Sequence, residues 1–180
     1  MTEAELYKQI KNCTALKKDR LKLMQSVLDE LKLFRPLLKL AFNVKHPDSH
    51  RAAWIVELLC LHDLMIIKDH LNYFSSHLNE LTNDSAKRPM AKICSLILHP
   101  KKGLKLTQLN KEKMTSTCFD WMIDDSAVAV KVYAMTSLYE LGKEKDWIHD
   151  ELRIILEKNY TSSSAGYKCR AREILKKIKV

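Results

Sequence analysis

The sequence predicts an all-α fold, a right-handed α–α superhelix or solenoid of about ten helices. The first observation is the scarcity of turn residues. The 180 residues contain three Gly and four Pro, too few for the closely spaced turns of an all-β domain. The second is an apolar periodicity of three and four residues along most of the chain. The third is a helix-start motif that recurs at intervals of 37, 43 and 37 residues.

Apolar stripes and helix-start residues place the helices in order along the chain. Thr2 and Glu5 form a capping box at the first helix start. Pro36 and Pro89 each fall in a first turn, where a missing N–H costs little. Gly142 is expected just after a helix end, as a left-handed C′ glycine. The expected helices cover about 3–12, 15–30, 33–43, 49–62, 64–80, 85–98, 108–123, 126–141, 145–158 and 165–178.

The helices differ in how much of their surface is apolar. Residues 49–62 are apolar on nearly every face, so we expect neighbours on several sides. Residues 64–80 carry one narrow stripe, which is typical of an outer helix, whereas 126–141 carries two stripes. This alternation indicates helix pairs with one outer and one inner member.

Four helix starts share a basic residue that is followed, three positions later, by a core residue. The core residue is Ala in three of them, and an Asp or Ser turn precedes each one. The four basic residues are Arg51, Arg88, Lys131 and Lys168. Their intervals match a two-helix solenoid repeat. We therefore expect one domain over 1–180, with a capping helix pair at 1–30 and four helix-pair repeats at 31–180.

These segments resemble HEAT repeats of the armadillo type, and more closely a family of small bacterial HEAT-like proteins. SHRAAWIVEL at 49–58, VAVKVYAMTSLYELGKE at 128–144 and YKCRAREILKKI at 167–178 carry the resemblance, which covers about residues 30–180. It implies the solenoid fold and no catalytic residues.

Genomes often label members of that family as adenylosuccinate lyases. The signature loop of that enzyme resembles S-S-x-M-P-x-K-x-N-P, and the sequence SSAGYK at 163–168 matches only part of it. The Met-Pro and Asn-Pro pairs are missing, and the chain is less than half the length that the lyase needs. We do not expect lyase activity.

The formal net charge of +9 suggests a basic binding surface. The candidates, on a concave face of the superhelix, are Arg51, Arg88, Lys92, Lys131, Lys168 and Arg172. Such a face would attract an anionic partner. The default interpretation of these residues is nevertheless structural: basic residues at helix starts bond turn carbonyls and carboxylates, as Lys131 would with Asp125.

Three tryptophans, Trp54, Trp121 and Trp147, lie in corresponding or neighbouring repeat positions. Core packing is the default interpretation, and an aromatic lining of a groove is the alternative. That alternative resembles the HEAT-like DNA glycosylases, which combine tryptophans with an acidic residue on a basic concave face. Glu57 and Asp120 are the acidic candidates.

The sequence carries no motif for catalysis, a cofactor or a metal. His70 and His77 share a helix face without a third ligand at zinc-site spacing. Five unpaired cysteines and the lack of a long apolar segment predict a cytoplasmic protein that does not enter membranes. We also expect a monomer. The expected function is a non-enzymatic binding module for a protein or an anionic partner, with nucleic acid as the alternative.

Overall fold

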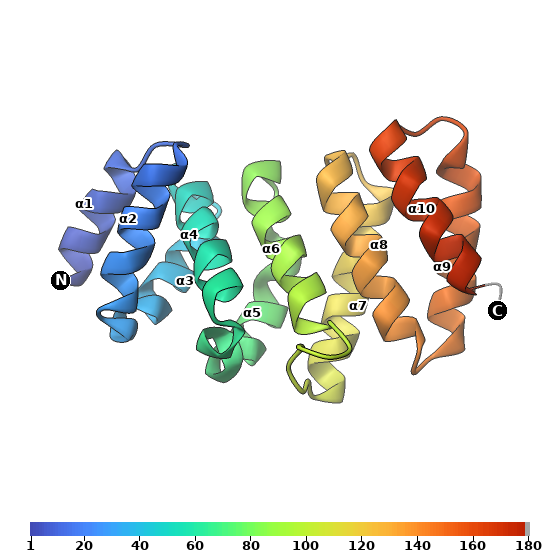
Figure 1. Ribbon diagram of the computed structural model, residues 1–180, viewed down its shortest axis with the longest axis horizontal. Helices are drawn as coiled ribbons and strands as arrows, with labels where there is room; N and C mark the ends of the chain where they lie inside the picture. The colour runs from blue at the N-terminus through green and yellow to red at the C-terminus, as the bar shows by residue number, and fades with distance from the viewer. Residues whose placement is uncertain (179–180) are drawn as a thin grey trace. The chain divides into compact units, whose positions relative to one another are not determined.

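The computed structural model describes residues 1–178, and over this range the chain forms ten α-helices and no β-strand (Figure 1). The predicted all-helical fold is confirmed. The α-helices are α1 (Glu3–Asn12), α2 (Lys17–Leu28), α3 (Phe34–Phe42), α4 (Ser49–His62), α5 (Leu71–His77), α6 (Asp84–Ile97), α7 (Gln108–Ile123), α8 (Val128–Gly142), α9 (Asp146–Tyr160) and α10 (Ala165–Ile178). The 3₁₀ helices in the same range are η1 (Leu31–Leu33), η2 (Leu64–His70) and η3 (Leu78–Glu80).

The helices form two compact units, Met1–Ile93 and Cys94–Val180, and the boundary falls within α6. In the first unit, α4 packs against α3 and α2 and also contacts α1. Buried residues, including Ala53, Ile55 and Glu57, cover about half of the circumference of α4, whereas Leu61 on the remaining side is 45% exposed. The near-continuous apolar run of this helix is therefore explained by its several neighbours, as predicted.

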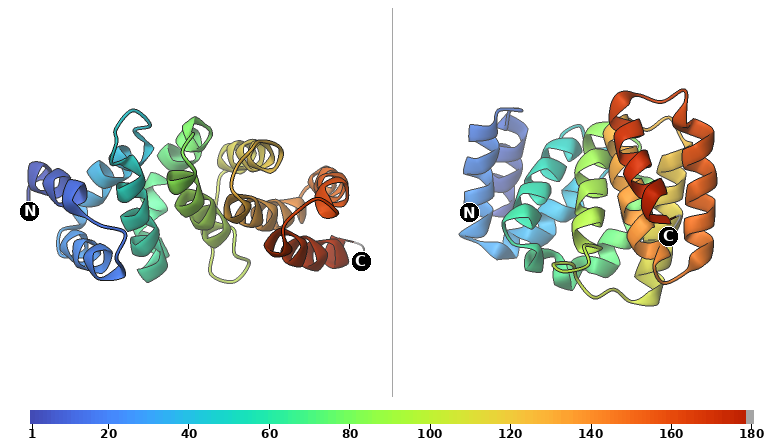
Figure 2. Two further views of the ribbon diagram at one scale, coloured as in Figure 1. Left: turned by 90° about the horizontal axis from the view of Figure 1, so that it is seen from above. Right: turned by 45° about the vertical axis from the view of Figure 1, so that its right-hand side comes forward.

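In the second unit, α8 packs against α7, α9 and α10. Figure 2 shows α7 and α9 in one layer and α8 and α10 in the other. Ala134 of α8 and Ala171 of α10, both predicted core residues of the repeat motif, are completely buried. The two apolar stripes of α8 follow from its contacts with helices of both layers.

Residues 64–80 do not form the single helix that the sequence predicted, because η2, α5 and η3 follow one another there. The Oδ1 atom of Asp63 accepts a hydrogen bond from the backbone N–H of Met65 at 2.9 Å, which fixes the start of η2. Ile67, Phe74 and Leu78 are fully buried, so the predicted apolar stripe does face the core. Its spacings alternate between three and four residues, and a spacing of three also fits a 3₁₀ helix.

Pro89 lies inside α6 and not in its first turn, so that prediction was wrong. The helix starts earlier because Asn83 caps it: its Oδ1 accepts from the N–H of Ser85 at 2.8 Å. Its backbone carbonyl accepts from the N–H groups of Ala86 and Lys87. Pro89 therefore removes a backbone donor from the second turn of α6.

Gly142 was also predicted wrongly. It is the last residue of α8, and its φ is not positive. The α8–α9 turn therefore does not need the conformational freedom of glycine at this position. What it needs there is space, because a side chain of α9 packs against the bare backbone of residue 142.

Candidate functional site

The predicted basic residues of the first unit contact acidic or carbonyl groups of the same unit. Arg51 pairs with Oδ1 of Asp48 at 3.2 Å and also donates to the backbone carbonyl of Lys11. Arg88 and Lys92 converge on Glu57, with N–O distances of 3.6 and 2.9 Å. These three cations therefore have structural partners inside the unit.

In the second unit, Lys131 donates from Nζ to the backbone carbonyl of Asp124 at 2.7 Å. The turn carbonyl, and not the Asp125 carboxylate suggested by the sequence, is thus the recorded partner. Lys168 and Arg172 lie on α10, and the Nε of Arg172 donates to the hydroxyl of Tyr160 at 3.1 Å. Arg172 is exposed, so α10 presents the most accessible member of the predicted basic face.

The three tryptophans have different environments and do not line one groove. Trp121 is 2% exposed and belongs to the core of the second unit. Trp54 is half-buried, with the His50 ring edge-on at 5.1 Å and the Arg20 guanidinium 5.7 Å from its ring centre. Trp147 is 53% exposed. Only Trp147 therefore offers a large aromatic surface to a ligand among these three.

The acidic candidates also differ. Glu57 is 6% exposed and forms ion pairs with two cations. Its role is therefore structural. Asp120 is exposed on α7. The glycosylase interpretation requires an accessible acidic residue near the tryptophans. Glu57 is buried and therefore does not meet this requirement.

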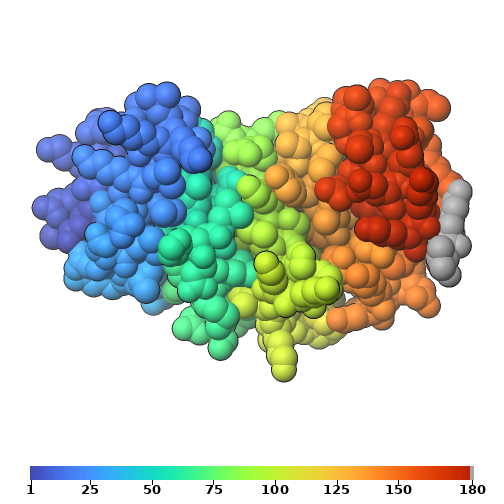
Figure 3. Space-filling model, in the orientation of Figure 1, coloured from blue at the N-terminus to red at the C-terminus, as the bar shows by residue number. Residues whose placement is uncertain are grey.

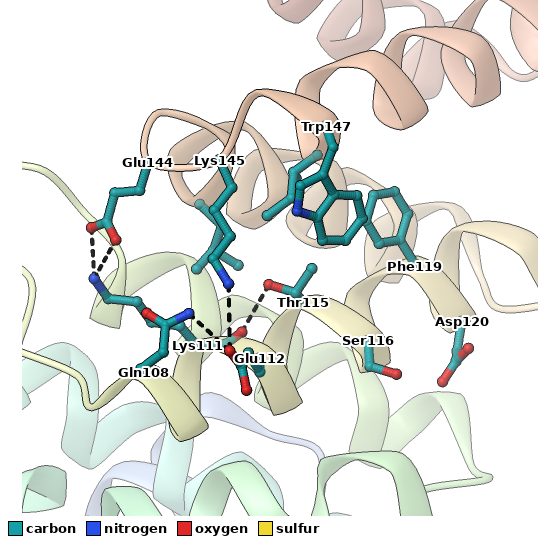
Figure 4. Close-up of a pocket in the computed structure, with 12 residues that line it drawn as sticks. Gln108, Lys111, Glu112, Thr115, Ser116, Phe119, Asp120, Glu144, Lys145 and Trp147 are labelled. Atoms are coloured by element: carbon teal, nitrogen blue, oxygen red, sulfur yellow. Dashed lines mark hydrogen bonds and ion pairs between the residues drawn. The ribbon is translucent and has the colours of Figure 1, made fainter.

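A groove with a volume of about 390 Å³ lies between α7 and α9 in the second unit (Figure 4). Its aromatic surface consists of Trp147 and Phe119, whose rings stack with centroids 5.9 Å apart and an interplanar angle of 24°. We call this the α7–α9 groove. Its lining residues are Gln108, Lys111, Glu112, Thr115, Ser116, Phe119, Asp120, Leu141, Glu144, Lys145, Trp147 and Ile148.

Two ion pairs join α7 to the α8–α9 turn at one end of the groove. Lys111 lies 2.6 Å from Glu144, and Lys145 lies 3.4 Å from Glu112. Hydrogen bonds from Gln108 and then Lys145 lower the pKa of the Glu112 carboxyl. Figure 4 shows these side chains on one side of the aromatic pair and Asp120 on the other. The groove thus has a neutralised end and an acidic end.

A second hollow of about 500 Å³ borders the loop between α6 and α7. Figure 3 shows this loop, in yellow-green, at the surface. Lys105 and Lys143 line the hollow, but Lys143 already pairs with Glu140 at 2.6 Å. Within residues 1–178, no three His, Cys, Asp or Glu side chains gather in a way that could hold a metal ion.

A family model described as a HEAT repeat domain matches residues 5–178. The chain belongs to this family. This HEAT repeat domain is therefore a helical-repeat scaffold, an architecture that offers extended binding surfaces. Searches of the curated proteins and of the solved structures gave no significant match. No helix in the described range has both the length and the apolar character needed to cross a bilayer.

Sequence reasoning named Trp147 and Asp120 but did not associate them with a common groove in this HEAT repeat domain. Phe119 was missed. The available signal was a tryptophan set among charges: Asp146 precedes Trp147, and Asp150 follows one helical turn later. A large apolar residue in such a polar context indicates an exposed position.

Proposed function

We propose that this HEAT repeat domain is a non-enzymatic binding module whose partner is a protein. The observation that carries the proposal is the exposed Trp147 ring, stacked on the half-buried Phe119 in a groove of about 390 Å³. Exposed aromatic side chains in a concave site are characteristic of protein-binding hot spots. We infer that the module acts as a monomer and that it works in the cytoplasm, a reducing compartment that its free cysteines support.

The nucleic-acid alternative has weaker support. It requires free cations, and Arg51, Arg88, Lys92 and Lys131 all have partners within their own units. The α7–α9 groove, in addition, carries Asp120 where a phosphate would be repelled. Lyase activity has no support from the sequence of the loop that precedes α10.

The test is recovery of partners from cells that express the protein naturally. We expect a specific protein to co-purify with the wild type and to be lost with Trp147→Ala, because the variant removes the exposed aromatic face. The matched control is Leu109→Ala, since Leu109 is 59% exposed on α7 and does not line the groove. The urea midpoints of both variants check that they remain folded.

Binding of single-stranded and duplex oligonucleotides at low and high salt is measured in parallel. Salt-sensitive binding that is abolished by Lys168→Glu with Arg172→Glu, without any protein partner, would replace our proposal with the nucleic-acid alternative. Retention of the partner by Trp147→Ala would also contradict the proposed groove.

A further inference from the structure

We infer that the occupant of the α7–α9 groove is an extended peptide segment with an Arg or Lys next to an apolar residue. The cationic side chain would lie on the Trp147 ring and pair with Asp120. The inference rests on the proposed protein-binding function and specifies the chemistry of the partner.

The aromatic surface favours a cation. Trp147 has half of its surface free although one face stacks on Phe119. The indole ring is the strongest side-chain platform for a guanidinium or ammonium group, through the negative face of its π system. An apolar neighbour of the cation would contact the apolar floor that Leu141 and Ile148 provide.

Charge complementarity also favours a positively charged occupant. Asp120 at the acidic end of the groove, Asp146 beside Trp147 and Glu151 one turn along α9 are all exposed. No ion pair or side-chain hydrogen bond is recorded for these three carboxylates within residues 1–178. Residues 114–157 carry an excess of five negative charges. A basic segment would therefore gain partners there without displacing existing ones.

The other end of the groove gives no attraction to an acidic partner. Lys111 and Lys145 are already paired with Glu144 and Glu112. An acidic peptide would have to break these pairs, whereas a basic peptide leaves them intact. The volume of about 390 Å³ fits a few side chains of a peptide, at the lower end of ordinary ligand sites.

The experiment selects random short peptides displayed on phage against the purified full chain. We expect enrichment of peptides that place Arg or Lys next to an apolar residue. One enriched peptide is then synthesised twice, with Arg and with citrulline, which keeps the shape and removes the charge. We expect the citrulline peptide to bind about tenfold more weakly.

Variants of the chain locate the binding site. Trp147→Leu keeps apolar bulk but removes the π face, and we expect about tenfold weaker binding of the Arg peptide. Asp120→Asn should weaken binding about two- to fivefold, the range of an exposed ion pair. Asp125→Asn is the matched control, because Asp125 is also exposed but does not line the groove. It should leave the affinity unchanged.

Three outcomes would overturn the inference: enrichment of acidic or purely apolar peptides, equal binding of the Arg and citrulline peptides, or unchanged affinity of Trp147→Leu. Each leaves the proposed function standing if a native partner still depends on Trp147. Enriched basic peptides without any native protein partner would instead contradict the proposed function alone. The two failures are therefore distinguishable.

Discussion

The imidazole ring of His149 occupies the space that a side chain at residue 142 would need. A Cβ atom on Gly142 would lie 2.0 Å from Cδ2 of His149. The ring is held there by Nε2, which donates to the carbonyl oxygen of Tyr139 at 2.8 Å, and by stacking on the Tyr139 ring. The end of α8 and the first turn of α9 thus meet at a point where only glycine fits.

We expect Gly142→Ala to lower the free energy of unfolding by about 1–3 kcal/mol, because His149 must leave its hydrogen bond or the helices must move apart. Urea denaturation measures the change. Gly166→Ala is the control, since the nearest atom to its Cβ would be Cγ1 of Val128 at 3.8 Å. In α10 that alanine should be neutral or stabilising. Equal effects at both sites would contradict the steric argument.

Lys92 should be needed for stability, because Glu57 is buried and Lys92 is its nearer cation. Lys92→Met leaves only the pair with Arg88 at 3.6 Å. We expect a loss of about 1–3 kcal/mol in the free energy of unfolding. Adding Glu57→Gln should recover part of the loss, which a double-mutant cycle measures. Additive effects of the two substitutions would mean that the Lys92–Glu57 pair contributes nothing to stability. The control is Lys158→Met, because Lys158 is an exposed residue.

The stability of the first unit should depend on the protonation of His70. Burial is the main cause that lowers the pKa of its imidazole, and Arg35 adds to it, while Asp69 opposes it. The ring also packs on Phe34, with centroids 5.3 Å apart. The unfolded chain therefore binds this proton more readily than the folded one, and stability falls as the pH drops through the imidazole range.

His70→Gln should remove this contribution. Between about pH 7.5 and pH 5.5, where an ordinary imidazole titrates, the free energy of unfolding should decrease less in the variant than in the wild type. Urea titrations at several pH values measure both. Parallel pH profiles for the two proteins would contradict the assignment.

Thiol reactivity should separate one cysteine from the other four. Cys169 is exposed, whereas Cys13, Cys60, Cys94 and Cys118 are buried. Burial raises the pKa of the Cys60 thiol to about 12, and raises that of Cys94 as well. A colorimetric thiol reagent should therefore modify one group rapidly in the native protein and all five in urea. Cys169→Ser should abolish the fast phase, and a second fast thiol would contradict the burial described.

Helices with strong end signals were predictable from the sequence. Thr2 and Glu5 form the predicted capping box, and α1, α4, α7 and α10 begin and end as expected. Prediction failed where the local sequence is compatible with two different structures. Asn83 and Asp84 are both good caps, and the choice of Asn83 moved Pro89 into the helix. A glycine near a helix end suits a left-handed turn or a close contact, and only tertiary packing decides which.

The candidate site was less predictable than the fold. The repeat motif identified Ala134 and Ala171 as core, because buried small residues recur with the repeat. The sequence also grouped three tryptophans by corresponding or neighbouring repeat positions, and the structure places them in core, half-buried and exposed positions. Phe119 and Trp147 are 28 positions apart, and their stacking depends on how α9 packs beside α7, which no local pattern encodes.

The ion pairs at the neutralised end of the α7–α9 groove make its geometry sensitive to ionic strength. Lys111–Glu144 and Lys145–Glu112 both involve accessible side chains, so added salt screens them. The stack of Phe119 on Trp147 is apolar and does not weaken in this way. High salt would therefore weaken the two ion pairs between α7 and the α8–α9 turn while the aromatic contact persists. The groove would then widen at its neutralised end. A change in ionic strength would then alter how readily a ligand enters the groove, before any effect on the ligand's own charge.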